Sequence, residues 1–102
     1  MRLDKFTLKA QEALEEARSL AGKKHHQQLD VEHLLWALLS QKDGVVVPIV
    51  QKLGVSPERI LAQVDYELNR LPQVTGSGAN QVYLSSRLNE ILNTAWKEAE
   101  RL

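Results

Sequence analysis

The chain has 102 residues, enough for one domain with a single hydrophobic core, and its 43% hydrophobic and 25% charged residues are typical of a globular protein. The 13 basic and 13 acidic residues cancel, which argues against a nucleic-acid-binding protein, because such proteins need a clustered basic surface. The absence of cysteine excludes disulfides, thiolate zinc sites and thiol nucleophiles.

The start of the chain has no apolar stretch of the kind found in a signal peptide. No segment approaches the roughly 20 apolar residues of a membrane span. We therefore expect a cytoplasmic domain that binds neither nucleic acid nor membrane.

The first predicted helix follows Thr7, whose side-chain oxygen can cap the first turn, and its apolar residues recur at helical spacing. Gly22 is expected to end this helix. Asp30 caps a second helix, from Val31 to about residue 41. Because this second helix is apolar on nearly every side, it is the predicted centre of the core.

A short third helix is expected at about residues 45–53, with Gly54 as its left-handed stop. Ser56 and Pro57 then start a fourth helix that runs to about residue 71. Residues 72–83 are predicted to be a flexible linker because they contain a Gly- and Ser-rich stretch.

Ser85 caps a fifth predicted helix, whose apolar stripe contains Leu88, Ile91, Leu92, Ala95 and Ala99. No segment alternates apolar and polar residues cleanly over four positions, as a half-buried strand would. The predicted fold class is therefore all-α, a small helical bundle of about five helices.

The fifth predicted helix repeats the first at a constant offset of 78 residues. The matched pairs are Phe6 with Leu84, Thr7 with Ser85, Ala10 with Leu88, Glu12 with Glu90, Ala13 with Ile91, Leu14 with Leu92, Ala17 with Ala95, and Ala21 with Ala99. A repeat of this length is a whole helical module. We therefore expect residues 1–71 to form a four-helix repeat and residues 84–102 to be the first helix of a second, truncated repeat.

Further motifs occur in a fixed order: Glu32-His33-Leu34-Leu35 with Ala37-Leu38-Leu39, then Leu53-Gly54-Val55, then Leu68-Asn69-Arg70-Leu71-Pro72. Together with the opening helix they resemble the N-terminal domain of the Clp ATPases. The last motif resembles the inter-repeat linker of ClpB-type protein disaggregases. In that family a peptide-binding groove lies between two four-helix repeats.

The resemblance implies a non-catalytic domain of an ATP-dependent chaperone of the stress response, which recruits exposed apolar segments of unfolded or aggregated proteins. It implies a hexameric parent whose ATPase domains bind ATP and Mg²⁺ outside this chain, so that the domain itself needs no cofactor. An adaptor-docking module of a Clp protease unfoldase is the alternative. If the stripe of the fifth helix is left uncovered, we expect the fragment to self-associate.

Six residues are predicted to contact substrate: Thr7, Val82, Tyr83, Leu88, Leu92 and Trp96. All but Thr7 would do so through apolar contacts that tolerate many sequences. The resemblance places Thr7 beside the groove, whereas its local pattern needs only a helix cap. For Leu88, Leu92 and Trp96 the competing interpretation is packing on the first four helices.

Other motifs do not predict a site. His25 and His26 are adjacent and diverge, and His33 has no cysteine or carboxylate at ligand spacing, so we predict a structural His33 and no metal. The Gly76-Ser77-Gly78 stretch lacks the lysine of a phosphate-binding loop. No nucleophile has a base and an orienting partner, so no catalytic residue is predicted.

Overall fold

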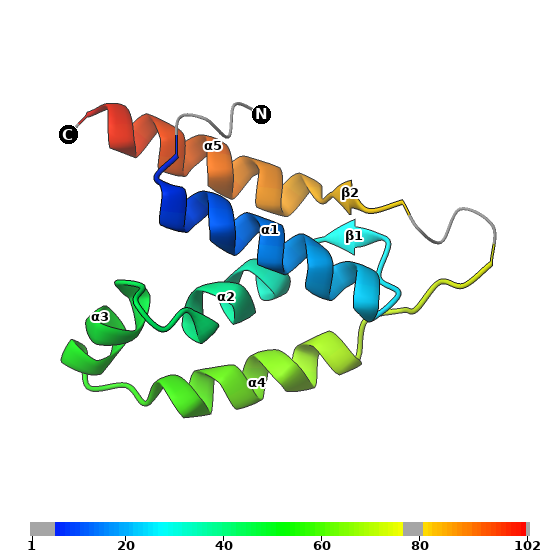
Figure 1. The fold of residues 1–102 in the computed structure, drawn as a ribbon, viewed down its shortest axis with the longest axis horizontal. Coiled ribbons are helices and arrows are strands. Elements are labelled where there is room, and N and C mark those ends of the chain that lie inside the picture. The colour runs from blue at the N-terminus through cyan, green and yellow to red at the C-terminus, as the bar shows by residue number, and fades with distance from the viewer. Residues whose placement is uncertain (1–5, 77–80, 102) are drawn as a thin grey trace.

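In the computed structural model, which describes residues 6–76 and 81–101, the chain forms five helices and two very short strands (Figure 1). The helices are α1 Leu8–Lys23, α2 Val31–Ser40, α3 Val46–Lys52, α4 Pro57–Asn69 and α5 Ser86–Glu100. This confirms the predicted small all-α bundle. Within the described part of the chain, no helix is long and apolar enough to cross a membrane.

The four longer helices begin after the predicted capping residues. The Thr7 hydroxyl accepts a hydrogen bond from the backbone N–H of Ala10 at 3.1 Å, and the Ser85 hydroxyl accepts one from Leu88 at 3.0 Å. These two caps are 78 residues apart. Capping of this kind satisfies amides that have no partner within the helix.

Helix α1 continues through Gly22 to Lys23, so the expected stop at Gly22 is wrong. His25 is the residue in the left-handed conformation, with φ of 60°. The N–H of His25 donates to Gly22 O, and the N–H of His26 donates to Ala21 O. This pair of bonds is the Schellman motif, which satisfies the last helical carbonyls and places the turn beyond the glycine.

The sequence did not predict the two strands, β1 Gln28–Leu29 and β2 Tyr83–Leu84, which pair in parallel. Two residues are too few to show an alternating pattern. The pairing nevertheless brings the end of the predicted linker, residues 72–83, against the turn after α1. Residues 77–80 of that linker lie outside the described part of the chain.

The core is centred on a close contact between α1 and α2, and Figure 1 shows α1 between α2 and α5, with α4 beyond α2. Four alanines in this cluster are completely buried, and such small side chains allow two helices to approach closely: Ala13, Ala17, Ala21 and Ala37. Two leucines of α5, Leu88 and Leu92, belong to the same cluster.

Helix α5 therefore packs against α1 and α2, in line with the sequence-based alternative of packing on the preceding helices. Only two of the five residues in its apolar stripe are covered. Leu88 and Leu92 are 0% and 5% exposed, whereas Ile91 is 44% exposed and Ala95 and Ala99 are also open to solvent. The helix thus has one apolar face inside the bundle and a second one outside it.

Candidate functional site

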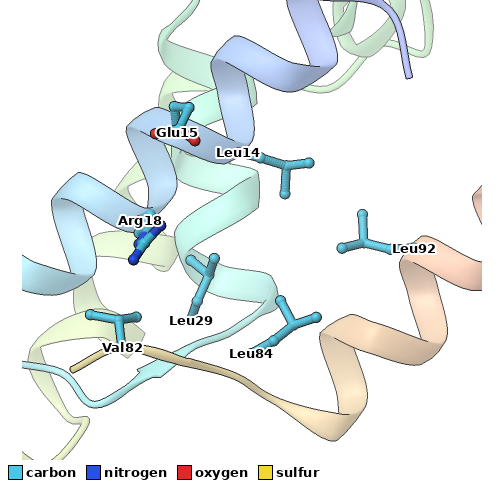
Figure 2. A pocket seen from close by; sticks show the side chains of 7 residues that line it. All are labelled: Leu14, Glu15, Arg18, Leu29, Val82, Leu84 and Leu92. Atoms are coloured by element: carbon cyan, nitrogen blue, oxygen red, sulfur yellow. The ribbon is translucent and has the colours of Figure 1, made fainter. Parts of the chain in front are cut away.

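An apolar groove of about 300 Å³ lies between α1, the two strands and α5 (Figure 2). Its lining residues are Leu14, Leu29, Val82, Leu84 and Leu92, with Glu15 and Arg18 on the α1 side. In Figure 2, Leu14 on α1 and Leu92 on α5 extend toward each other from opposite walls, and Leu29 and Leu84 extend toward the same space from the strands below.

Strand pairing forms the end of this groove. The N–H of Tyr83 donates to Gln27 O at 2.7 Å, and the N–H of Ser85 donates to Leu29 O at 3.0 Å. Leu29 and Leu84 are register partners, so their side chains lie next to each other. Because side chains alternate along a strand, Val82 and Leu84 face the groove together and Tyr83 faces away from it.

One carboxylate joins the start of α2 to the start of α5. Oδ1 of Asp30 accepts hydrogen bonds from the Val31 N–H at 2.7 Å, the Ser85 hydroxyl at 2.9 Å and Arg87 Nε at 3.1 Å. Arg87 also pairs with Glu32, one helical position beyond Val31. The α5 wall of the groove is therefore anchored to the N-terminus of α2.

This anchor is charged at neutral pH. Burial raises the pKa of Asp30, but the hydrogen bonds from Val31, Arg87 and Ser85 outweigh burial and hold the pKa below its usual value. Hydrogen bonds to Asp30 and Glu32 raise the pKa of Arg87. Negative charge at the N-terminus of a helix also interacts favourably with the helix dipole.

Two buried histidines form a hydrogen-bonded pair next to this anchor. His33 is 0% and His26 3% exposed, and His26 Nδ1 lies 2.9 Å from His33 Nε2. The Asp30 N–H donates to His33 Nδ1, so His33 must carry its proton on Nε2 and donate it to His26. His26 Nδ1 is therefore an acceptor, and the proton of neutral His26 is on Nε2.

The predicted structural role of His33 is confirmed, because its side chain completes a capping box with Asp30. The sequence analysis missed its partner His26, since the contact depends on the turn after α1. Burial, chiefly, lowers the pKa of both histidines. Positive charge on Lys24 and His25 adds to the effect at His26, whereas the carboxylates of Glu32 and Asp30 partly oppose it at His33. Among the described residues, no three His, Cys, Asp or Glu side chains are placed to hold a metal ion.

Of the six residues predicted to contact substrate, Val82 and Leu92 line the groove. Leu88 lies beneath it as a fully buried core residue, which agrees with the packing interpretation. Tyr83 is 56% exposed on the opposite face of β2, where its hydroxyl donates to the Gln81 side chain.

The remaining two lie toward the other ends of the helices. Trp96 is half-buried, and its ring meets Phe6 edge-on with centroids 6.3 Å apart. Thr7 is exposed and lines a different hollow, between the start of α1 and the chain around Val45. The structure therefore does not bring Thr7 and Val82 into one pocket.

Besides the charged Glu15 and Arg18, three apolar lining residues were absent from the predicted set: Leu14, Leu29 and Leu84. Two of them had a signal, because the 78-residue repeat makes Leu14 the counterpart of Leu92 and Leu84 the counterpart of Phe6. Leu29 had none, because it contributes through a two-residue strand.

Comparison with known proteins agrees with this architecture. Residues 5–102 match the family described as the Clp repeat (R) N-terminal domain. The whole chain is 44% identical to the chaperone protein ClpB of Bacillus cereus, 39% to that of Nitratidesulfovibrio vulgaris and 38% to that of Meiothermus ruber. It spans about 12% of the length of each of these relatives. The chain belongs to the Clp repeat (R) N-terminal domain family.

Proposed function

We propose that this chain is the substrate-recruitment domain of an ATP-dependent chaperone, and that its groove binds exposed apolar segments of unfolded or aggregated polypeptides. The observation that carries the proposal is the groove itself. Five apolar side chains converge there from four elements, and the relatives of the chain are chaperones.

The chemistry of the groove suits a broad range of substrates. Burial of apolar area contributes about 25 cal/mol per Å² whatever the order of the side chains, so recognition is weak and tolerant of sequence. Glu15 and Arg18 put one charge of each sign at the rim, which gives no preference for the net charge of a substrate. Such binding is readily reversible, as a handover step requires.

In this proposal the domain binds unfolded polypeptides and carries out no chemical step itself. ATP and Mg²⁺ would bind to other parts of a hexameric, cytoplasmic parent, and no cofactor would bind here. Residues 84–102 would open a second helical repeat, which is supported by the exposed face of α5 at Ile91, Ala95 and Ala99.

The proposal is tested by placing a charge in the groove. Leu84 lines the groove and Tyr83, its neighbour on β2, faces the other way, so Leu84→Asp and Tyr83→Asp form a matched pair. Reduced, carboxymethylated α-lactalbumin, which is permanently unfolded, serves as the probe in fluorescence anisotropy. We expect Leu84→Asp to weaken binding at least about tenfold, because a carboxylate would have to be desolvated, and Tyr83→Asp to change it less than about twofold.

Equal affinity of the two variants would contradict the proposal. So would saturable binding to a folded adaptor protein together with none to the unfolded probe, which would favour the adaptor-docking alternative. Circular dichroism of both variants establishes that they are folded under the conditions of the binding assay.

A further inference from the structure

A second cavity, of about 340 Å³, lies on the other side of β1. Its lining residues are His26, Gln27, Gln28, Asp30, Leu71, Pro72 and Val74, none of which lines the groove. The segment after α4 forms its outer wall and is held in place by a hydrogen bond of 2.7 Å from the Val74 N–H to His25 O. The cavity is therefore a separate, built feature of the domain.

Among the residues that the structure describes, none pairs with the edge of β1 at this cavity. Gln27 O and Leu29 O accept hydrogen bonds from the β2 side, so the backbone groups of Gln28 between them face the opposite edge. Within residues 6–76 and 81–101, neither the N–H nor the C=O of Gln28 has a hydrogen-bond partner. Unpaired strand edges of this kind are templates for another strand.

The second free group is the ring N–H of His26. The hydrogen bond from His33 occupies Nδ1 of His26, so neutral His26 carries its proton on Nε2. This Nε2 has no partner among the described residues. No completely covered side-chain nitrogen or oxygen in that part of the chain lacks a partner. The unpaired Nε2 must therefore reach open space, and the cavity that His26 lines provides it.

We propose that an extended polypeptide segment binds here as a third strand, pairing with Gln28 through its backbone and placing a carbonyl oxygen on the His26 Nε2–H. An apolar side chain of the same segment fills the cavity between Leu71, Pro72 and Val74. This site is independent of the groove and is read through the main chain rather than through a particular sequence.

The chemistry favours a polypeptide over a small anion. Among the described residues, the groups without a partner at this cavity are two donors, the Gln28 N–H and the His26 Nε2–H, and one acceptor, the Gln28 C=O. A backbone in extended conformation can satisfy all three. Asp30 also places a carboxylate among the lining residues, which disfavours an anion. Its charge is shared with Arg87 and Ser85, so it is not free to bind a cationic ligand. A peptide unit is neutral and presents both a donor and an acceptor.

The test uses a ¹⁵N-labelled chain carrying Leu84→Asp, in which the groove is blocked, and a capped pentapeptide of sequence Ser-Leu-Val-Leu-Ser. We expect peptide addition to shift the amide resonance of Gln28 and the Nε2–H resonance of His26 downfield, because both acquire an acceptor. Gln28→Pro removes a backbone N–H that makes no bond within the described chain, and it should weaken binding about three- to tenfold. Gln28→Thr keeps the N–H and should bind as before.

The proposal is overturned if the peptide leaves the Gln28 and His26 resonances unchanged, or if Gln28→Pro and Gln28→Thr bind equally. Should Gln28→Pro fail to fold, the two resonances in the Leu84→Asp chain decide the matter alone. If the original chain did not bind carboxymethylated α-lactalbumin in its groove but the peptide still shifted the Gln28 and His26 resonances, the function proposed for the groove would be refuted. The proposal for the second cavity would remain supported.

Discussion

Asp30 should contribute more to stability than an ordinary helix cap, and Asp30→Ala tests this. The carboxylate caps α2, accepts from the Ser85 hydroxyl and pairs with Arg87, and its side chain is only 18% exposed. Loss of the cap costs about 1 kcal/mol, and loss of the hydrogen bond to a charged group about 1.5 kcal/mol. The ion pair adds at most about 0.5 kcal/mol because Arg87 is 58% exposed.

The expected total is a loss of about 3 kcal/mol from the free energy of unfolding. For a domain of this size it corresponds to a fall in Tm of about 12–24 °C. Urea denaturation followed by circular dichroism measures the first quantity, and thermal denaturation the second. The m-value should not change, since the surface exposed on unfolding is the same.

Ser56→Ala is the matched control. Ser56 also caps a helix, accepting from the Arg59 N–H at 3.4 Å, but its other hydrogen bond is to the exposed neighbour Glu58. This variant should lose only about 0.5–1 kcal/mol. If Asp30→Ala were no more destabilising than Ser56→Ala, the contacts of Asp30 with Ser85 and Arg87 would contribute nothing measurable to the free energy of unfolding.

Two more predictions concern pH and backbone conformation. Because burial lowers the pKa of His26 and His33, the unfolded chain takes up their protons first, and the free energy of unfolding should fall as the pH drops below about 6.5. Equal stability in urea at pH 7.5 and pH 5.5 would contradict this. Gly54 has φ of 81°, so Gly54→Ala should cost about 1–2 kcal/mol, whereas Gly22 lies in α1 with open space at its Cβ position, and Gly22→Ala should stabilise by about 0.5–1 kcal/mol. Thermal denaturation of the two alanine variants should give Tm shifts of opposite sign.

Local signals predicted the helices well because each is specified by a few neighbouring residues. Ser56 and Pro57 start α4, and Asp30 starts α2, through contacts within one turn. The error at Gly22 has the same origin, since a glycine permits a helix to end there but does not require it. The bonds from His25 and His26 decide the end of α1 instead.

The groove was harder to predict because its parts meet only through tertiary structure. Leu29 lies in a strand of two residues, and the sequence carries no pattern for it. Tyr83 and Val82 looked equivalent in the sequence, whereas strand pairing turns their side chains to opposite faces. The hydrogen bond from His33 to His26 likewise needs the turn after α1 to bring the two rings together.

Two residues of the groove's facing walls, Leu14 and Leu92, are 78 positions apart in the sequence. Helices α1 and α5 run in opposite directions side by side in Figure 1, and the equivalent residues Leu14 and Leu92 face each other across the groove. The same offset of 78 residues pairs Phe6 with Leu84 and Arg18 with Trp96, so the contact between Phe6 and Trp96 corresponds in sequence to Leu84 and Arg18 at the groove.

At the first end two aromatic rings fill the space between the helices, and at the second the smaller Leu84 and the charged Arg18 leave it open. Arg18→Trp should therefore fill the groove with the residue that fills the opposite end. We expect it to weaken binding of carboxymethylated α-lactalbumin at least about tenfold while leaving Tm unchanged or raised, because it adds apolar contact without removing a described hydrogen bond. Arg18→Ala, which keeps the groove open, should bind within about twofold of the original chain. Full affinity in Arg18→Trp would show that the open end of the groove is not where the unfolded chain binds.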